Sequence, residues 1–478
     1  MNKKIVIHVL GLSLVLESAC MLLPLICSLI YRESDAFAFA VSAAICFVSG
    51  FLLKSIVPKK RNMYAKEGLA AVSLSWICMS LFGALPFIIS GAIPNFFDAL
   101  FETVSGFTTT GASILKDVEK LSHGMLFWRS FTHWIGGMGV LVFLVSLLKL
   151  SGGDNLYLLK AESTGPAVGK IVPRVQSSAK ILYAMYTFFT ILEILLLLIG
   201  GMPLFDSITI SLGTAGTGGF AVRNSGMAGY TAFQQNVVTV FMILFGIDFS
   251  LYYLLLMRKF KAVFKSEELR GYLGVILASI ILICINISGL FDNIWTALKH
   301  SAFQVASIIT TTGYATTDFD KWPEFSKTIL LLLMFIGACA GSTGGGMKVS
   351  RIIIAFKTVI KELKITVHPQ STHKITINRQ LVAHETIRAV NVYMVAYFVI
   401  FAFSLLLVSM DKFDFATNFS AIAATINNIG PGFARVGPTC NFGDYSSFSK
   451  IVFIFNMLVG RLEIFPMLIL FSPYTWKK

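Results

Sequence analysis

The stretch Phe107-Thr108-Thr109-Thr110-Gly111-Ala112-Ser113 ends a short amphipathic segment that is too short to cross a bilayer. Three turns of the same kind follow, each between two apolar segments long enough to span. They are Ala215-Gly216-Thr217-Gly218, Thr310-Thr311-Thr312-Gly313 and Asn427-Asn428-Ile429-Gly430. Irregular backbone at membrane depth occurs only where it is buried in protein or lines a water-filled path. Four such turns predict a single ring of backbone carbonyls, which is how a cation filter is built.

The composition is that of a polytopic membrane protein. The chain has 478 residues, of which 55% are hydrophobic and 13% charged, and its mean hydropathy is +0.76. Soluble domains have about 25% charged residues, and one membrane span needs about 20 mostly apolar residues. We therefore predict an all-α protein that crosses the lipid bilayer many times.

The formal net charge of +14 reflects topology and does not require a nucleic-acid partner. Basic residues cluster in loops that fall on one side of the membrane, at 59–66, 149–180, 258–270 and 348–388. The positive-inside rule places these loops in the cytoplasm, and both basic termini with them. We expect no nucleic acid among the partners.

The sequence carries no sign of a catalytic or metal centre. The seven cysteines and seven histidines have no spacing typical of a disulfide framework or a metal site. No nucleophile–base pair is apparent either, so we predict a protein that is not an enzyme and has no cofactor in this chain. The apolar run from Lys3-Lys4 to about Ile30 is too long for a signal peptide, and we expect a retained first span.

A repeat of about 100 residues organises the chain after an opening helix pair. Each repeat has a span, a half-length helix that ends in one of the turns, a second span and a basic loop. The predicted divisions are the helix pair 1–57 and the repeats 58–150, 151–258, 259–364 and 365–478. The predicted spans are 5–31, 35–56, 67–92, 124–150, 179–202, 230–257, 268–289, 325–362, 386–409 and 447–473.

The half-length helices share a Phe-Asp start. The four pairs are Phe97-Asp98, Phe205-Asp206, Phe291-Asp292 and Phe413-Asp414. Asp at a helix start is expected to cap free backbone N–H groups, and the opposite end then points its partial negative charge towards the turn. Glycine lets successive carbonyls point the same way, and threonine hydroxyls add oxygen ligands that suit a hard cation.

Three further sequence motifs are as distinctive as the turns. They are His133-Trp-Ile-Gly-Gly-Met-Gly139, Gly341-Ser-Thr-Gly-Gly-Gly-Met-Lys348 and Gly460-Arg-Leu-Glu-Ile-Phe465. With the turns, they resemble the Trk/Ktr/HKT superfamily of potassium transporters over nearly the whole chain. The opening helix pair favours the TrkH branch over the shorter KtrB branch.

This resemblance implies four repeats around one central pore in a bacterial cytoplasmic (inner) membrane. It also implies a homodimer with one pore per subunit and a cytoplasmic ring of TrkA-type nucleotide-binding subunits that controls opening. The potassium-binding filter residues of the family carry over to Thr109, Thr110, Gly111, Gly216, Thr217, Gly218, Thr311, Thr312, Gly313, Asn428, Ile429 and Gly430. In related plant transporters Ser at the first filter Gly goes with sodium preference, so Gly111 favours potassium. Gly216, where repeats one and three have Thr, is expected to alter ligand symmetry rather than ion choice.

A glycine-rich stretch interrupts the second span of repeat three. Its candidate gating residues are Gly341, Gly344, Gly345, Gly346 and Lys348. The stretch lacks the Gly-Lys-Ser/Thr ending of a phosphate loop. Close helix packing through small residues is one interpretation, and we favour a break in a pore-lining helix. In the family this loop is a gate below the filter, and our hypothesis is that it swings aside when the pore conducts.

Arg461 lies inside the last predicted span, with Glu463 two residues on. A charge at mid-bilayer costs at least about 2.5–3.5 kcal/mol on insertion scales, so it should face protein or water. A structural ion pair is one interpretation. The resemblance implies instead that Arg461 points into the pore under the filter as an electrostatic barrier to cations.

Other ionisable residues fall inside the predicted spans. For Glu17 and Glu193 we favour interhelical hydrogen bonds over a transport role, and Asp248 is a candidate for a role in the pore cavity. His133 begins a glycine-rich packing stretch and is expected to be structural.

Two classes of function fit these features. The first is a channel-like potassium uptake protein that is driven by membrane potential and gated by a cytoplasmic partner. The alternative is a secondary potassium symporter coupled to H+ or Na+, since broken helices also mark many carriers. All four repeats run in the same orientation, which favours the pore.

Overall fold

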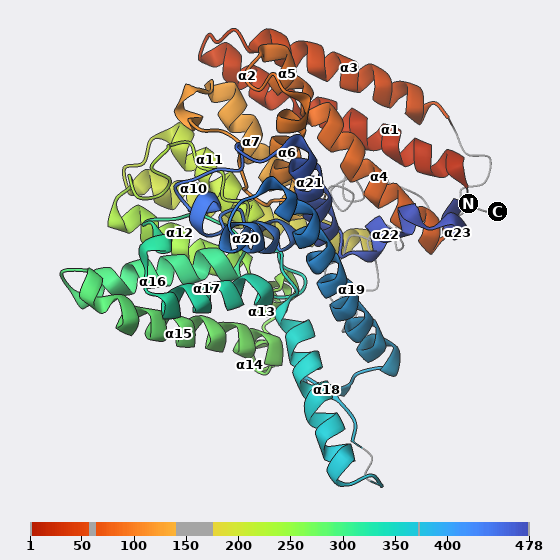
Figure 1. The fold of residues 1–478 in the computed structure, drawn as a ribbon. Coiled ribbons are helices and arrows are strands. Elements are labelled where there is room, and N and C mark those ends of the chain that lie inside the picture. The colour runs from red at the N-terminus through yellow and green to blue at the C-terminus, as the bar shows by residue number, and fades with distance from the viewer. Residues whose placement is uncertain (1, 57–63, 140–174, 371–372, 477–478) are drawn as a thin grey trace.

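The computed structural model describes residues 2–56, 64–139, 175–370 and 373–476, and these are mostly helical (Figure 1). Six described helices are long and apolar enough to cross a membrane, or seven if one bent pair is a single span. The all-α polytopic fold predicted from the sequence is confirmed. The residue boundaries of the repeats stay predictions.

The opening helix pair consists of α1 (Lys3–Cys20), continued by α2 (Leu22–Ile30), and α3 (Ala36–Lys54). Two glycines bring α1 and α3 together. An ideal Cβ on Gly11 would lie 2.3 Å from the Lys54 backbone nitrogen, and one on Gly50 would lie 2.8 Å from the Val15 nitrogen. Small residues that let two backbones approach are typical of helix packing in membranes.

Each repeat starts with one span, and each of these begins and ends within four residues of its prediction. The spans are α4 (Ala65–Gly83) with α5 (Leu85–Ser90), α10 (Val175–Ile199), α15 (Glu267–Ile287) and α19 (His384–Val408). A half-length helix follows each span. These helices are α6 (Phe96–Phe107), α11 (Leu204–Gly216), α16 (Ile294–Ile309) and α20 (Phe415–Ile426).

The second helices are all shorter than predicted. They are α7 (His123–Gly137), α12 (Ala232–Phe245), α17 (Glu324–Ile336) and α21 (Ser447–Arg461). The predicted break in repeat three is present, because residues 337–348 separate α17 from α18 (Val349–Val367). Part of the span predicted at 124–150 lies outside the described residues.

Two of the spans that were predicted to be continuous are broken. In repeat two, α12 meets α13 (Phe249–Leu256) at an angle of 89°. In repeat four, residues 462–464 separate α21 from α22 (Phe465–Phe471), and Glu463 and Ile464 both have a positive φ of 64°. Apolar sequence alone gave no sign of these breaks, because both sides of each remain hydrophobic.

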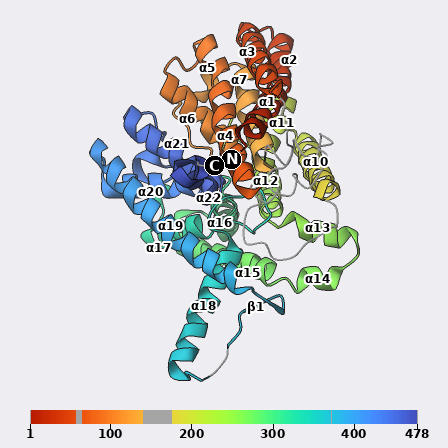
Figure 2. The ribbon, with the colours of Figure 1, turned by 90° about the vertical axis from the view of Figure 1, so that its right-hand side faces the viewer.

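The remaining elements of the described residues are short. They are α14 (Phe260–Phe264), α23 (Pro473–Trp476), five 3-10 turns at Val118–Lys120, Ser288–Leu290, Phe319–Lys321, Ser409–Asp411 and Ala434–Val436, and the hairpin strands β1 (Thr376–Ile377) and β2 (Gln380–Leu381). Figure 2 shows α18 and β1 at one end of the molecule, with the two chain termini side by side in both views.

The predicted caps of the half-length helices are correct for one aspartate only. The Asp414 carboxylate accepts a hydrogen bond from the Thr417 N–H at 3.0 Å and caps α20. In α6 and α16 the cap is an asparagine, Asn95 and Asn293. In α11 the residue at the cap position is Pro203, whose side chain makes no capping hydrogen bond. Asparagine and aspartate serve equally well at this position, so the Phe-Asp pairs located the helices but not the capping side chains.

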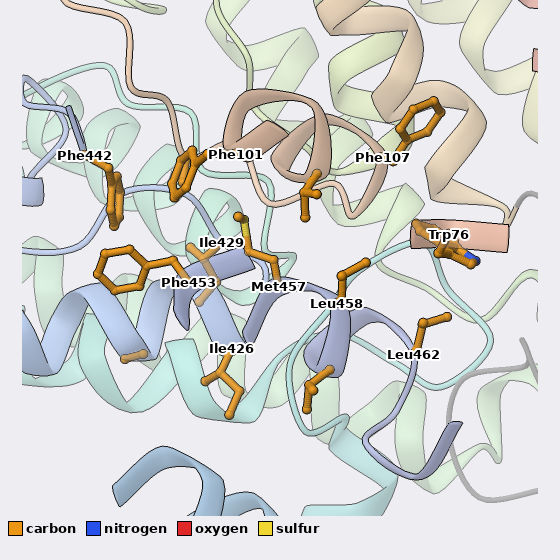
Figure 3. Close-up of a cluster of buried hydrophobic side chains, with 14 of the residues drawn as sticks. Trp76, Phe101, Phe107, Ile426, Ile429, Phe442, Phe453, Met457, Leu458 and Leu462 are labelled. Atoms are coloured by element: carbon orange, nitrogen blue, oxygen red, sulfur yellow. The ribbon is translucent and has the colours of Figure 1, made fainter. Parts of the chain in front are cut away.

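Aromatic and aliphatic side chains fill the space between α6 and α21. Figure 3 shows Ile429, from the repeat-four turn, among Phe101 of α6 and Phe453 and Met457 of α21. All four side chains are fully buried. The core therefore reaches directly to the backbone of a turn and fixes its position.

The close approach of α1 and α3 gives a prediction for stability. Replacing Gly11 with Val places methyl groups against the α3 backbone, and overpacking of this kind typically costs about 1–3 kcal/mol or more. We expect a clear fall in the thermal unfolding midpoint of the purified protein. Gly274→Val on α15 is the control, since nothing lies within 4 Å of its Cβ position. Equal midpoints for the two variants would contradict the packing argument.

Candidate functional site

The four Thr/Gly turns follow the same backbone path. In each, one residue just after the half-length helix adopts a left-handed conformation, and a glycine with positive φ follows two residues later. The pairs are Thr109 (55°) and Gly111 (75°), Thr217 (54°) and Gly219 (76°), Thr311 (60°) and Gly313 (85°), and Asn428 (56°) and Gly430 (100°). A non-glycine residue with positive φ is uncommon. Four of them at equivalent places mark one structure repeated four times.

This geometry corrects the register predicted for repeat two. The backbone equivalent of Thr109-Thr110-Gly111 is Thr217-Gly218-Gly219, one residue later than the predicted Gly216–Gly218. Hydrogen bonds agree, because Gly218 N–H donates to the Gly213 carbonyl at 2.8 Å just as Thr110 N–H donates to Ser105 at 2.9 Å. The sequence misled because Gly216, Gly218 and Gly219 lie close together and only the dihedral angles tell them apart.

The turns close a ring. An ideal Cβ on Gly111 would lie 1.9 Å from the Gly218 carbonyl oxygen, and one on Gly219 would lie 1.9 Å from the Thr312 oxygen. A Cβ on Gly313 would lie 2.0 Å from the Ile429 oxygen. The last contact returns to the first turn, with 2.8 Å from Gly430 to the Thr110 oxygen. Each glycine thus packs against the neighbouring repeat in the cyclic order one, two, three, four.

The ring brings four half-length helices to one place. Each of α6, α11, α16 and α20 ends where its turn begins, so the C-terminal ends of all four lead into the ring. A helix carries about half a negative charge at this end. The arrangement provides carbonyl oxygens and converging negative dipole ends, which together stabilise a cation and repel an anion.

Buried side chains tie each turn to other repeats. His133 of α7 lies 2.8 Å from the Gly106 carbonyl through Nδ1, and its Nε2 accepts from the Phe220 N–H at 3.3 Å. Because Nε2 accepts, Nδ1 is the protonated nitrogen and donates. His133 therefore joins repeats one and two, which is the structural role expected for it.

Repeat four is bound to repeat one in a similar way. The Asn428 amide donates to the Thr110 hydroxyl and to the Met457 carbonyl, both at 2.9 Å. Asn427 accepts from the Tyr397 hydroxyl at 3.0 Å. These amides take the place of the threonine hydroxyls of repeats one and three, where Thr108 pairs with Thr110 at 2.8 Å.

A cavity of about 450 Å³ opens on one side of the ring. Its lining includes Gly111, Gly219, Gly313 and Gly430 and the loops that follow them. The loops are cross-linked, since the Asn224 amide donates to Asp117 at 2.7 Å. This bond is the main reason that the pKa of Asp117 lies below its usual value.

The glycine-rich loop, residues 337–348, closes the other side of the ring. The Gly345 N–H donates to the Thr311 hydroxyl at 2.6 Å, and the Gly346 N–H donates to the Asn427 carbonyl at 3.1 Å. Gly344 lies so close that a Cβ would meet the Thr310 carbonyl oxygen at 2.8 Å. Gly341 has a left-handed φ of 72° and is exposed. The loop therefore packs directly against the backbone and side chains of two of the turns.

Arg461 fastens this loop to repeat one. Its guanidinium donates to the Thr343 carbonyl at 2.7 Å and to the Gly136 and Gly137 carbonyls at 2.6 Å. Lys348, at the end of the loop, donates to the Gly344 carbonyl and is also buried. Two buried cationic side chains thus lie beneath the ring, and their role as a barrier to cations stays a prediction.

Glu463 has a different partner from the one its spacing suggested. Its carboxylate pairs with Arg351 of α18, whose guanidinium also stacks 4.0 Å above the Tyr393 ring. The break at 462–464 turns the chain so that Glu463 faces α18. The printed sequence gives no indication of this pairing.

The three other intramembrane acids lie in different environments. The Cys46 thiol contacts Glu17 at 3.7 Å, which is an interhelical contact between α3 and α1. The Glu193 carboxyl of α10 lies against Thr214 of α11, which is also an interhelical contact. Asp248 caps α13 by accepting from the Ser250 N–H at 2.8 Å.

One buried ion pair was missed by the sequence reasoning. Arg129 of α7 and Glu102 of α6 meet at 2.8 Å with side chains only 2% and 0% exposed. Glu102 also accepts from the Ser113 hydroxyl and the Ile114 N–H at 3.0 Å, and Arg129 lies 4.0 Å above the Phe220 ring. The pair supports the loops just after two of the turns. Two opposite charges in apolar segments were the available signal.

Breaking this pair should destabilise the protein strongly. Arg129→Met leaves the Glu102 carboxylate buried without its countercharge, which typically costs about 3–5 kcal/mol. We expect a large drop in the thermal unfolding midpoint. Arg223→Met is the control, because Arg223 is 40% exposed in its pair with Asp206 and exposed pairs contribute about 0–1 kcal/mol. A midpoint for Arg129→Met equal to that of the control would refute this assignment.

Comparison with known proteins gives one consistent result. The sequence model of the TrkH family, described as cation transport protein, matches residues 34–478. The Trk system potassium uptake protein TrkH of Salmonella typhimurium is 35% identical over 489 residues, with 100% of both chains covered. TrkG of Escherichia coli, which has the same description, is 32% identical over 481 residues and 99% of both chains.

A solved structure agrees with these matches. The crystal structure of the potassium transporter TrkH from Vibrio parahaemolyticus superimposes with a TM-score of 0.90 at 32% identity, and the match covers 100% of both chains. The agreement extends over the opening helix pair as well as the four repeats. The chain described here therefore belongs to the TrkH family of cation transport proteins.

Proposed function

We propose that this protein carries potassium ions into the cell through a single pore at the centre of the four repeats. The observation that carries the proposal is the ring of turns, in which carbonyls of Thr110, Gly218, Thr312 and Ile429 occupy equivalent places. Carbonyl oxygens that replace a hydration shell are the basis of potassium filters. The names of the relatives, which are potassium uptake proteins and a potassium transporter, support the same ion.

The proposed filter takes ligands from the predicted residues, with Gly219 added by the corrected register. Potassium would enter from the 450 Å³ cavity, which the four ring glycines line. The first filter position is Gly111, where related plant transporters that prefer sodium have Ser, and this supports a preference for potassium. Because repeat four has Asn428 and Ile429 where repeat one has two threonines, the site is only pseudo-fourfold.

The loop 337–348 and Arg461 would control the opening of the pore. In the arrangement described above the loop contacts Thr311 and Asn427 of the ring, and Arg461 binds the Thr343 carbonyl. We propose that this is a closed state and that conduction requires the loop to move aside. A cytoplasmic TrkA-type nucleotide-binding subunit is the proposed driver, acting on a homodimer in the bacterial inner membrane with both termini cytoplasmic.

A secondary symporter coupled to H+ or Na+ is the second candidate. Its support is the buried carboxyl of Glu193 beside Thr214, next to the repeat-two turn, which is a place where a proton could bind. Single-channel recording from reconstituted protein separates the two candidates, since a carrier turns over too slowly to give resolvable openings. Resolved potassium openings support the pore, and their absence alongside proton-coupled uptake supports the symporter.

Ion replacement in vesicles tests the proposed ion. Purified protein in liposomes should pass potassium and rubidium much faster than sodium under the same gradient. Measuring each cation in turn, with and without the cytoplasmic partner, gives selectivity and control in one series. Equal rates for sodium and potassium would contradict the proposed filter.

The corrected register predicts that Gly219 is part of the filter. Gly219→Ala forces a Cβ into the Thr312 carbonyl, so we expect the potassium flux or its preference over sodium to fall at least about tenfold, the effect of about 1.4 kcal/mol. Gly201→Ala is the matched control, because Gly201 has a similar φ of 78° but open space around it. If Gly219→Ala matches the control in rate and selectivity, the register is irrelevant to conduction.

Removal of Arg461 tests the barrier. Arg461→Ala takes away a buried positive charge and three hydrogen bonds to the loop region and α7, so basal potassium flux should rise several-fold without the partner. Arg388→Ala, an exposed arginine on α19, should leave the flux unchanged. A fall in flux for Arg461→Ala in folded protein would show that the arginine is not a barrier.

A further inference from the structure

Two adjacent acids at the start of α15, Glu267 and Glu268, hold two different parts of the protein. Neither is in the ring or in the loop 337–348. Their side chains point to different partners because successive helical positions lie about 100° apart. The contacts of each show how the loop is connected to the end of the molecule that carries α18 and the hairpin.

One oxygen atom of Glu268 binds a residue on each side of the glycine-rich stretch 341–346, and we call these two residues the margins of the loop. Its Oε1 accepts from the Ala340 N–H at 2.7 Å and from the Ser350 N–H at 3.1 Å. Ala340 precedes the glycine-rich turn, and Ser350 lies in the first turn of α18 beyond it. Hydrogen bonds to a carboxylate are stronger than neutral ones. The carboxylate therefore fixes the distance between the two ends of the segment that would have to move.

The filter-facing contacts of the loop lie on the other side. Gly345, Gly346 and Thr343 bind the ring and Arg461, whereas Glu268 approaches from α15 and touches only the margins. Loss of Glu268 would leave the filter contacts in place. It would remove one restraint on displacement of Ala340 and Ser350, beside the backbone hydrogen bonds that Cys339 and Gly341 make with Gly246 and Phe249.

Glu267 is bound to the hairpin β1–β2. Its N–H donates to the Asn378 side chain at 2.7 Å, and its Oε1 accepts from the Asn378 N–H at 3.1 Å. Its Oε2 pairs with Lys357 of α18, which also donates to the Thr376 carbonyl at 2.7 Å. Ile377 of the hairpin is buried against Ile354 of α18. One residue thus joins α15, α18 and the hairpin.

The hairpin is built to be reached from outside. Asn378 and Arg379 form its tip with positive φ of 52° and 64°, and both are exposed. The stretch that contains it is one of the basic segments assigned to the cytoplasm. A force applied to the tip reaches Glu267 through the paired bonds to Asn378, and reaches Glu268 through the next peptide unit of α15.

We propose that Glu268 is a positioning residue that latches the loop 337–348 beneath the ring, and that Glu267 connects this latch to the hairpin 376–381. Displacement of the hairpin by a cytoplasmic partner would shift the start of α15 and release Ala340 and Ser350. This inference rests on the proposed function, because it assigns a means of control to the same pore. The cytoplasmic partner would therefore act on the hairpin rather than on the loop itself.

The test uses the full-length protein in planar bilayers without any partner. Glu268→Gln weakens two charge-assisted hydrogen bonds, so the open probability should rise about tenfold. The unitary conductance and the potassium-to-sodium permeability ratio should stay as in the unmodified protein, since the ring is untouched. A merely structural defect would lower the amount of active protein without this combination.

Further variants test separately the latch at Glu268 and its connection to the hairpin through Glu267. Asn378→Ala should raise the open probability in the same direction, because it detaches the hairpin from Glu267. The double variant with Glu268→Gln should show no further rise, since residues that act through one another are not additive. Glu385→Gln is the control, an exposed acid in the first turn of α19, the corresponding span of repeat four.

The outcomes are distinct. Open probabilities of Glu268→Gln and Asn378→Ala within twofold of the Glu385→Gln control would overturn the latch while leaving the pore intact. Fully additive effects of the two changes would overturn the connection through Glu267. If Glu268→Gln does not fold, Glu268→Asp, which keeps the charge but shortens the reach, is judged by the same criterion. Absence of potassium current in the unmodified protein would instead refute the proposed function.

Discussion

Everything in this structure depends on how closely four stretches of backbone approach one another at the centre. Each ring glycine lies where a Cβ would overlap a carbonyl oxygen of the next repeat, at 1.9 Å for Gly111 and Gly219. Such an approach is open only to a residue without a side chain. It joins the four turns into a continuous ring of backbone, with one carbonyl of each turn against the glycine of its neighbour. The half-length helices, the spans around them and the buried tyrosine and asparagine bonds hold the turns at that distance.

The charges follow from the same constraint. A ring of carbonyls and helix C-terminal ends favours a cation, and the proposed function also requires a means of keeping the pore closed. The breaks in the second helices bring irregular backbone and Arg461 beneath the ring, which is why we propose that control resides there. Glu102 and Arg129 stabilise the loops on the opposite side, where both charges are shielded from lipid. Arg461 and Lys348 thus lie where the chain leaves regular helix, whereas Glu102 and Arg129 lie within α6 and α7 and pair with each other.

Particular residues show how far sequence reasoning reached. Thr109, Thr311 and Asn428 were placed correctly in the backbone register because Thr-Thr-Gly and Asn-Ile-Gly each offer a single glycine at the end. Repeat two has three glycines within four residues, so its register could be assigned only from the φ angles of Thr217 and Gly219. Asp414 was recognised as a cap, whereas Asn95 and Asn293 took that role elsewhere because the helices begin at slightly different points. The pairing of Glu463 with Arg351 joins residues 112 apart in sequence, which no local pattern encodes.

The sequence by itself determined the membrane character, the fourfold repetition, the position of the turns and the interruption at Gly341–Gly346. These are local properties, since hydropathy, charge and glycine placement act within a few residues. Only the tertiary structure decided the cyclic order of the ring, the bends after α12 and α21, and the partners of Arg461 and Glu268. Those features arise from contacts between repeats, where the cost of burying a charge or a free N–H is met by a group from a distant part of the chain.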